Sequence, residues 1–126
     1  DTAHLIVTRG EHSYEVGPFV IPGVTPCYQC SQHARAAADP FHLAHLRELE
    51  SWPLAPLALL AHFAAAQRIG QLVMDFASGA LTQSQCAQVA TIGEDGSTRI
   101  EEVEPASNCV CGIDGLASSL TPLRRR

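Results

Sequence analysis

Four of the five cysteines in this 126-residue chain form two close pairs, Cys27 with Cys30 and Cys109 with Cys111. Thiolates two or three positions apart on a turn can bind one metal ion together, and two such turns supply the tetrahedral sulfur set that Zn²⁺ prefers. Residues 31–108 separate the two pairs, so a shared ion would join a late segment to an early one. The pattern predicts a structural zinc site whose four sulfur ligands leave no position for an activated water.

Two other interpretations of these cysteines stay open, namely two disulfides or buried thiols without a metal. The second pair has one intervening residue where two are usual, which still lets both thiolates bind at a tighter angle. The first residues carry no basic stretch followed by a long apolar run, so no signal peptide is recognisable. We therefore expect a cytoplasmic location with reduced thiols, which favours metal binding over disulfides.

The remaining candidates for chemistry have weaker patterns. His33 lies three residues after Cys30 and could replace a missing ligand, whereas His42 and His45 share a predicted helix without a carboxylate to complete a set. Cys86 has no histidine or basic residue beside it in sequence to lower its pKa, which indicates a packed, inert thiol. No Ser/His/Asp pattern is recognisable, and we predict no catalytic residue in the chain.

Short β-branched runs on both sides of a helical middle predict strands that bring the cysteine pairs into place. These strands are expected at residues 4–8, 14–21, 85–92 and 97–103. Turn residues at 10–13 and 93–96 predict two hairpins, and the charged last strand is expected at a sheet edge. The proline-rich turn 22–26 holds Cys27, because proline fixes φ, and the second hairpin leads directly to Cys109.

Two helices are predicted between the strands. The first covers residues 41–49, with Asp39 as its N-cap and Pro40 at its first position. The second is long, covers about residues 56–77 and ends before Gly79. Its apolar residues recur at helical spacing and predict one buried stripe. The stripe consists of Leu59, Phe63, Ala66, Ile69, Val73 and Phe76.

Composition limits the classes of function. A net charge of −5 without a basic stripe argues against general nucleic-acid binding, and the basic run at residues 124–126 is expected to be a solvated tail. No stretch reaches the roughly 18 apolar residues of a membrane span. Charged residues make up 17% of the chain, below the usual quarter or so. This low charge and a start without Met predict a piece of a longer protein that covers part of its surface.

Residues 16–30, Val-Gly-Pro-Phe-Val-Ile-Pro-Gly-Val-Thr-Pro-Cys-Tyr-Gln-Cys, resemble the second half of ThiF-type, ubiquitin-activating-enzyme-like proteins. The resemblance is closest to divergent members that accompany thiazole/oxazole peptide cyclodehydratase systems. Those proteins carry a similar Gly-Pro to Pro-Gly stretch into a first C-x-x-C, then an Asp-Pro motif like Asp39-Pro40. A long helix, a small sheet and a late C-x-C or C-x-x-C like Cys109-Val-Cys111 follow. The resemblance covers roughly residues 4–112.

The resemblance implies the C-terminal half of a Rossmann-like α/β fold, with a long helix, a small mostly antiparallel sheet and a structural zinc site. Residues 1–112 would form this zinc-binding part, and residues 113–126 a flexible tail. The family adenylates a C-terminal carboxylate, using a Gly-rich loop and an acidic Mg²⁺ ligand in its first half. Neither the Gly-x-Gly-x-x-Gly pattern nor a cysteine within residues 31–85 is present here. Only the zinc ligands therefore carry over, and the segment alone is not expected to be catalytic.

In such a parent protein, ATP and Mg²⁺ would bind through the missing N-terminal part. The partners implied are a peptide or carrier-protein substrate and a second copy in a homodimer. A second hypothesis is a free-standing zinc-binding module that captures an extended peptide along its edge strand at residues 97–104.

Overall fold

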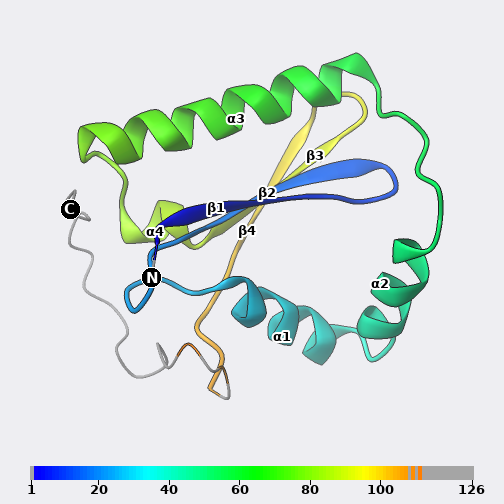
Figure 1. The fold of residues 1–126 in the computed structure, drawn as a ribbon, viewed down its shortest axis with the longest axis horizontal. Coiled ribbons are helices and arrows are strands. Elements are labelled where there is room, and N and C mark those ends of the chain that lie inside the picture. The colour runs from blue at the N-terminus through cyan, green and yellow to red at the C-terminus, as the bar shows by residue number, and fades with distance from the viewer. Residues whose placement is uncertain (1, 108, 110, 112–126) are drawn as a thin grey trace.

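A four-stranded antiparallel sheet forms the centre of the molecule, and its strands follow one another in sequence order. The computed structural model describes residues 2–107, 109 and 111. The strands are β1 (His4–Arg9), β2 (Ser13–Val20), β3 (Gln88–Gly93) and β4 (Thr98–Glu102). Both predicted hairpins are confirmed, and they pair with each other through β2 and β3 (Figure 1).

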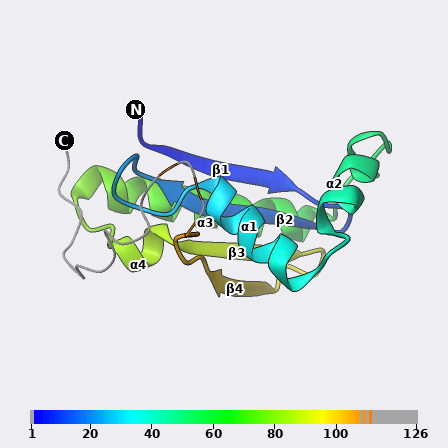
Figure 2. The ribbon, with the colours of Figure 1, turned by 90° about the horizontal axis from the view of Figure 1, so that it is seen from below.

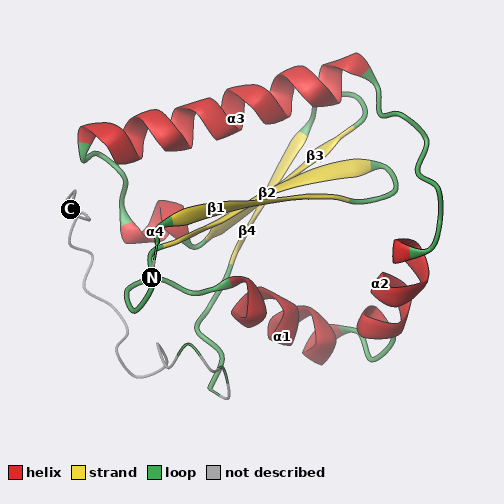
Figure 3. Cartoon of the chain, in the orientation of Figure 1, coloured by secondary structure: helices red, strands yellow, loops and turns green. Residues whose placement is uncertain are grey.

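Within the described residues the chain has four helices, which cover both faces of the sheet. They are α1 (Tyr28–Ala38), α2 (His42–Glu50), α3 (Leu59–Ser78) and the single turn α4 (Gln83–Cys86). The long helix α3 lies along one face, whereas α1 and α2 lie on the other side (Figures 1 and 3). Figure 2, seen from the side of α1, shows β1 and β4 at opposite edges of the sheet. The fold is therefore mixed α/β with an antiparallel sheet, and its relation to a Rossmann-like fold stays a prediction.

Two hydrophobic clusters pack against the two faces of the sheet. The larger one lies under α3 and consists of Val16, Phe19, Ala65, Leu72, Leu81, Cys86 and Ile92. The smaller one lies at the cysteines and consists of Cys30, Val89, Val103 and Cys109. Strand β3 contributes to both clusters because successive side chains of a strand point to opposite faces. Ile92 belongs to the first and Val89 to the second, so the cysteine cluster and the main core share one strand.

The long helix is confirmed, but the predicted buried stripe on it is wrong in part. Leu59, Phe63 and Val73 are 67%, 65% and 48% exposed, whereas Ala61, Ala65 and Leu72 face the sheet. Ile69 and Phe76 do pack against the core, as predicted. The physical reason is that α3 is apolar on nearly every side, so spacing alone does not decide which side the sheet covers.

Three local features also differ from the prediction. The segment at residues 28–38 is the helix α1, which the sequence pattern missed because alanine supplies most of its apolar positions. The predicted strand at 85–92 starts late, because Thr82 and Gln85 form a capping box that opens α4. Asp39 does not cap α2: its carboxylate accepts a hydrogen bond from the Phe41 N–H, as in an Asx-turn between the helices.

Gly17 lies where the backbones of β2 and β3 approach each other closely. Its φ of +120° lies outside the usual range for L-residues, and a Cβ there would collide with the Gln88 carbonyl oxygen. Paired residues of these two strands extend from Ser13 to Val16, so the regular pairing ends at the residue before this glycine.

The predicted tail, residues 113–126, lies outside the described residues. Among the residues that are described, no helix combines the length and the hydropathy that a bilayer span requires.

Candidate metal centre

The first cysteine pair is positioned by the start of α1. Cys27 is the N-cap residue with extended backbone, and Cys30 lies in the first turn, where the Ser31 N–H donates to the Cys27 carbonyl at 3.4 Å. The preceding turn is fixed by the buried hydroxyl of Thr25, which accepts from the Ile21 N–H at 2.8 Å and donates to the Phe19 carbonyl at 3.1 Å. The prediction of a rigid turn before Cys27 is confirmed in these bonds.

The second pair arrives from the end of the β3–β4 hairpin. Beyond β4, the Val103 N–H donates to the Ala87 carbonyl at 2.8 Å, which keeps the chain beside the start of β3. The Cys109 N–H then donates to the Ala106 carbonyl at 3.1 Å and closes a turn. Val103 and Cys109 are both buried in the smaller hydrophobic cluster. The cysteines are thus delivered by backbone hydrogen bonds and apolar packing together.

The four sulfur atoms form one group, in which all lie within 4.8 Å of one another. The Sγ of Cys27 lies 3.8 Å from that of Cys30 and 3.4 Å from that of Cys109, and the sulfurs of Cys30 and Cys111 are 3.5 Å apart. A tetrahedral ion with zinc–sulfur bonds of about 2.3 Å requires sulfurs about 3.8 Å apart. All five cysteines are free thiols, so the structure does not support the disulfide alternative. The spacing fits a shared zinc ion.

The surroundings of the sulfurs oppose their ionisation in the absence of a cation. Burial is the main reason that the pKa values of the Cys27 and Cys30 thiols are raised. At Cys109 a backbone hydrogen bond from Cys111 lowers the pKa, but burial and neighbouring thiols outweigh it and the pKa is raised. Metal ligands must be thiolates, so a bound dication would reverse this preference and release protons on binding.

The other candidate residues do not join this group. Across residues 2–107, 109 and 111, the four cysteines are the one cluster of three or more possible ligands close enough to hold an ion. His33 and His45 are exposed, and His42 Nε2 lies 2.7 Å from the amide oxygen of Gln32. Cys86 is fully buried in the main core, and burial raises its pKa to about 12. Its predicted role as an inert packed thiol agrees with this environment.

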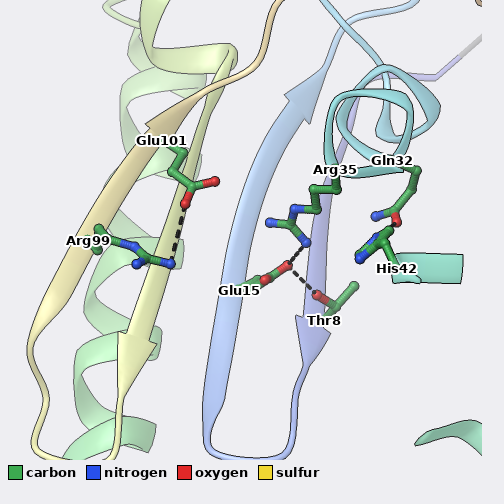
Figure 4. Close-up of polar contacts among 7 residues, drawn as sticks. All are labelled: Thr8, Glu15, Gln32, Arg35, His42, Arg99 and Glu101. Atoms are coloured by element: carbon green, nitrogen blue, oxygen red, sulfur yellow. Dashed lines mark hydrogen bonds and ion pairs between the residues drawn. The ribbon is translucent and has the colours of Figure 1, made fainter. Parts of the chain in front are cut away.

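A polar cluster that holds α1 to the sheet was not predicted (Figure 4). Arg35 of α1 donates to the Glu15 carboxylate at 2.8 Å, and the Thr8 hydroxyl donates to the same carboxylate at 3.4 Å. Next to it, Gln32 of α1 bonds His42 of α2. Strand alternation places Thr8 and Glu15 on one face, but nothing local in the sequence identifies Arg35 as their partner. Through α1, this cluster also fixes the position of Cys30.

The chain was compared with protein-family models, with curated proteins and with solved structures, and none of them matches it. The resemblance to ThiF-type proteins therefore rests on the sequence motifs alone.

Proposed function

We propose that Cys27, Cys30, Cys109 and Cys111 form a structural zinc centre that fastens the segment after β4 to the start of α1. The single observation that carries the proposal is the grouping of four sulfur atoms within 4.8 Å of one another. The two ligand pairs are separated by most of the chain, so the ion acts as a cross-link between the β3–β4 hairpin and α1. A closed set of four thiolates leaves no coordination position for substrate or water.

Metal analysis tests this centre directly. The chain purified with zinc and a reductant is expected to contain one zinc ion per chain, and Co²⁺ in its place should give the visible bands of a tetrahedral thiolate site. Cys109→Ser should lower metal affinity by at least tenfold, whereas Cys86→Ala, which removes the thiol outside the group, should keep one zinc per chain. Clearly less than one zinc per chain in the unmodified protein, with oxidised thiols, would overturn the assignment.

At the level of the whole protein, we propose that the chain is the zinc-bearing C-terminal portion of a ThiF-like peptide-modification protein. The motif run at residues 16–30 and the joining of the two cysteine pairs support this proposal. The segment would then support the fold of its parent and not catalyse adenylation itself, because its sequence has no Gly-rich nucleotide loop. ATP, Mg²⁺ and a peptide or carrier-protein substrate would be bound by a cytoplasmic parent through its N-terminal part.

The complete reading frame and ATP–pyrophosphate exchange test this assignment. An in-frame Gly-rich βαβ segment before β1 is expected, and the full-length protein should exchange pyrophosphate with ATP in the presence of its peptide. A reading frame without such a segment would refute the ThiF-like assignment. If the segment is present but the full-length protein exchanges no pyrophosphate with any peptide, only the adenylating activity is refuted. The chain would then belong to a non-catalytic relative that presents a peptide to a partner.

A second candidate function is a free-standing zinc-stabilised module that binds an extended peptide. The observation that favours it is β4, whose five residues are all exposed and which ends the described sheet. An added strand would pair with this open edge through main-chain hydrogen bonds. Titration of a labelled peptide library should then shift the NMR signals of the β4 amides, and absence of such shifts with every peptide would exclude the module.

A further inference from the structure

Helix α3 presents an apolar face to solvent as well as to the sheet. One row of its exposed residues recurs at alternating spacings of four and three positions, which is the heptad spacing of a helix–helix seam. We call them the outer stripe: Leu59, Phe63, Ala66, Gly70, Val73 and Ala77. Every member is exposed, and neither charged residue of the helix, Arg68 or Asp75, belongs to it. A helix that is apolar all round is normally covered on all sides.

The spacing of the outer stripe is the same when it is read from either end. A second α3 that runs antiparallel, with the two-fold axis at position 68, therefore places its own outer stripe against that of the first copy. Phe63 then lies opposite Val73 of the other copy, and Ala66 lies opposite Gly70. Leu59 at one end meets Ala77, so each larger side chain faces a smaller one. We infer that the outer stripe is a self-association surface through which two copies of this chain pack α3 against α3, antiparallel.

Gly70 is an independent reason for this assignment. Glycine in the middle of a helix is destabilising relative to alanine. Within one chain nothing requires it, because a Cβ at Gly70 would meet no atom within 4 Å. In the paired arrangement Gly70 faces Ala66 near the crossing point, where small residues let two helix axes approach to about 8 Å. The partner copy thus supplies the close neighbour that the single chain lacks.

The exposed area is sufficient for a weak but specific dimer. On the side of the outer stripe the large exposed side chains are Leu59, Phe63, Val73 and the neighbouring Met74, each 48–68% accessible. At about 150 Å² for a large apolar side chain, they leave on the order of 370 Å² uncovered per copy. Covering this surface on both copies, together with the small residues between them, removes about 1,000 Å², the lower limit for a specific interface.

Sedimentation of the zinc-loaded chain over a wide concentration range tests the surface. The unmodified chain should pass from monomer to dimer, and Phe63→Lys should weaken the dimer at least tenfold. Gln71→Lys gives the same net charge on an exposed position outside the stripe and should change the dissociation constant less than twofold. Circular dichroism establishes that both variants keep their helices. A monomer at all concentrations, or equal weakening by both variants, overturns the proposal.

Cross-linking tests the register. In the antiparallel pair, residue 66 of one copy lies opposite residue 70 of the other, within the range that a disulfide can bridge. An equimolar mixture of the Ala66→Cys and Gly70→Cys variants should therefore form a mixed disulfide faster than either variant alone, with zinc protecting the four native ligands. Faster cross-linking of Ala66→Cys with itself would indicate parallel packing and refute the inference. Neither measurement depends on the ThiF-like assignment.

Discussion

Removal of zinc should destabilise the chain by an amount that loop closure predicts. The proposed ion joins Cys30 to Cys109. Without it, the described part of the segment after β4 would still be held by the Val103–Ala87 hydrogen bond and by the small cluster around Val89, but not by a metal cross-link. Chelation under reducing conditions removes the cross-link and leaves four neutral thiols in place. Chelation does not change the side chains of the main core under α3, so the loss of stability measures the contribution of the cross-link alone.

The magnitude follows from the number of residues that the ion encloses. A cross-link around a loop of about 80 residues removes chain entropy worth roughly 4.5 kcal/mol at 25 °C, by the same relation used for disulfides. Net stabilities of domains are about 5–15 kcal/mol, so the zinc-free chain should lose between about a third and nine tenths of its net stability. For a chain of this size, 4.5 kcal/mol corresponds to a fall of about 15–20 °C in Tm.

Urea denaturation and thermal melting with and without a zinc chelator, in the presence of a reductant, measure this loss. The unfolding transition of the zinc-loaded protein should shift as calculated, and readdition of Zn²⁺ should restore it. Amide exchange at Val103 should accelerate more than exchange at Val16 in the main core. A decrease in Tm of less than about 3 °C would refute the reasoning, because it would mean that the segment after β4 docks without a metal cross-link.

Three further predictions follow from other parts of the structure. Arg35→Ala breaks a half-buried ion pair with Glu15, in which each side chain is 24% exposed, and should cost about 1–2 kcal/mol in urea denaturation. Arg99→Ala removes an exposed ion pair with Glu101, 3.3 Å long, and should cost less than about 0.5 kcal/mol. Equal losses of stability in the two variants would contradict the argument that burial strengthens the pair of Arg35 with Glu15. Gly17→Ala should lower the free energy of unfolding by more than about 3 kcal/mol, because the Cβ would collide with a carbonyl oxygen of β3 and φ is +120°. A Tm within 2 °C of the unmodified chain would show instead that β2 and β3 can separate there at little cost. Burial raises the pKa of Cys86 to about 12, so the contribution of this thiol to stability is complete below pH 9 and is lost as the pH rises from 9 toward 12. Iodoacetamide at pH 8 should alkylate Cys86 only when the protein unfolds. Rapid labelling of the native protein would show that Cys86 is not buried.

The sequence was sufficient to predict the elements whose pattern is local. β-branched runs with turn residues between them identified both hairpins, and Gly79 marked the end of α3 with a φ of +78°. The cysteines that form the candidate metal centre were also predictable, because two close pairs of cysteines are typical of metal sites. Nothing in the sequence alone, however, shows that residues 27 and 109 lie side by side.

The features that were missed depend on tertiary contacts. The apolar residues of α3 surround the helix, so only packing against β2 and β3 selects the alanine-rich side as the inner one. The ion pair between Glu15 and Arg35 joins a strand to a helix 20 residues later, without a local pattern. The start of β3 was misplaced because a capping box at Thr82 competes with the strand pattern.

The order in which the ligands occur along the chain has a consequence for biosynthesis. Cys27 and Cys30 are translated about 80 residues before Cys109 and Cys111, so at 5–20 residues per second roughly 4–16 s separate the two pairs. For most of this interval the β1–β2 hairpin has been made but β3, its neighbour in the finished sheet, has not. The nascent chain therefore carries two unpartnered thiols that glutathione or a foreign soft cation can occupy first. If such an occupant binds first, metallation requires a ligand exchange, which can be completed only after Cys109 and Cys111 have been made.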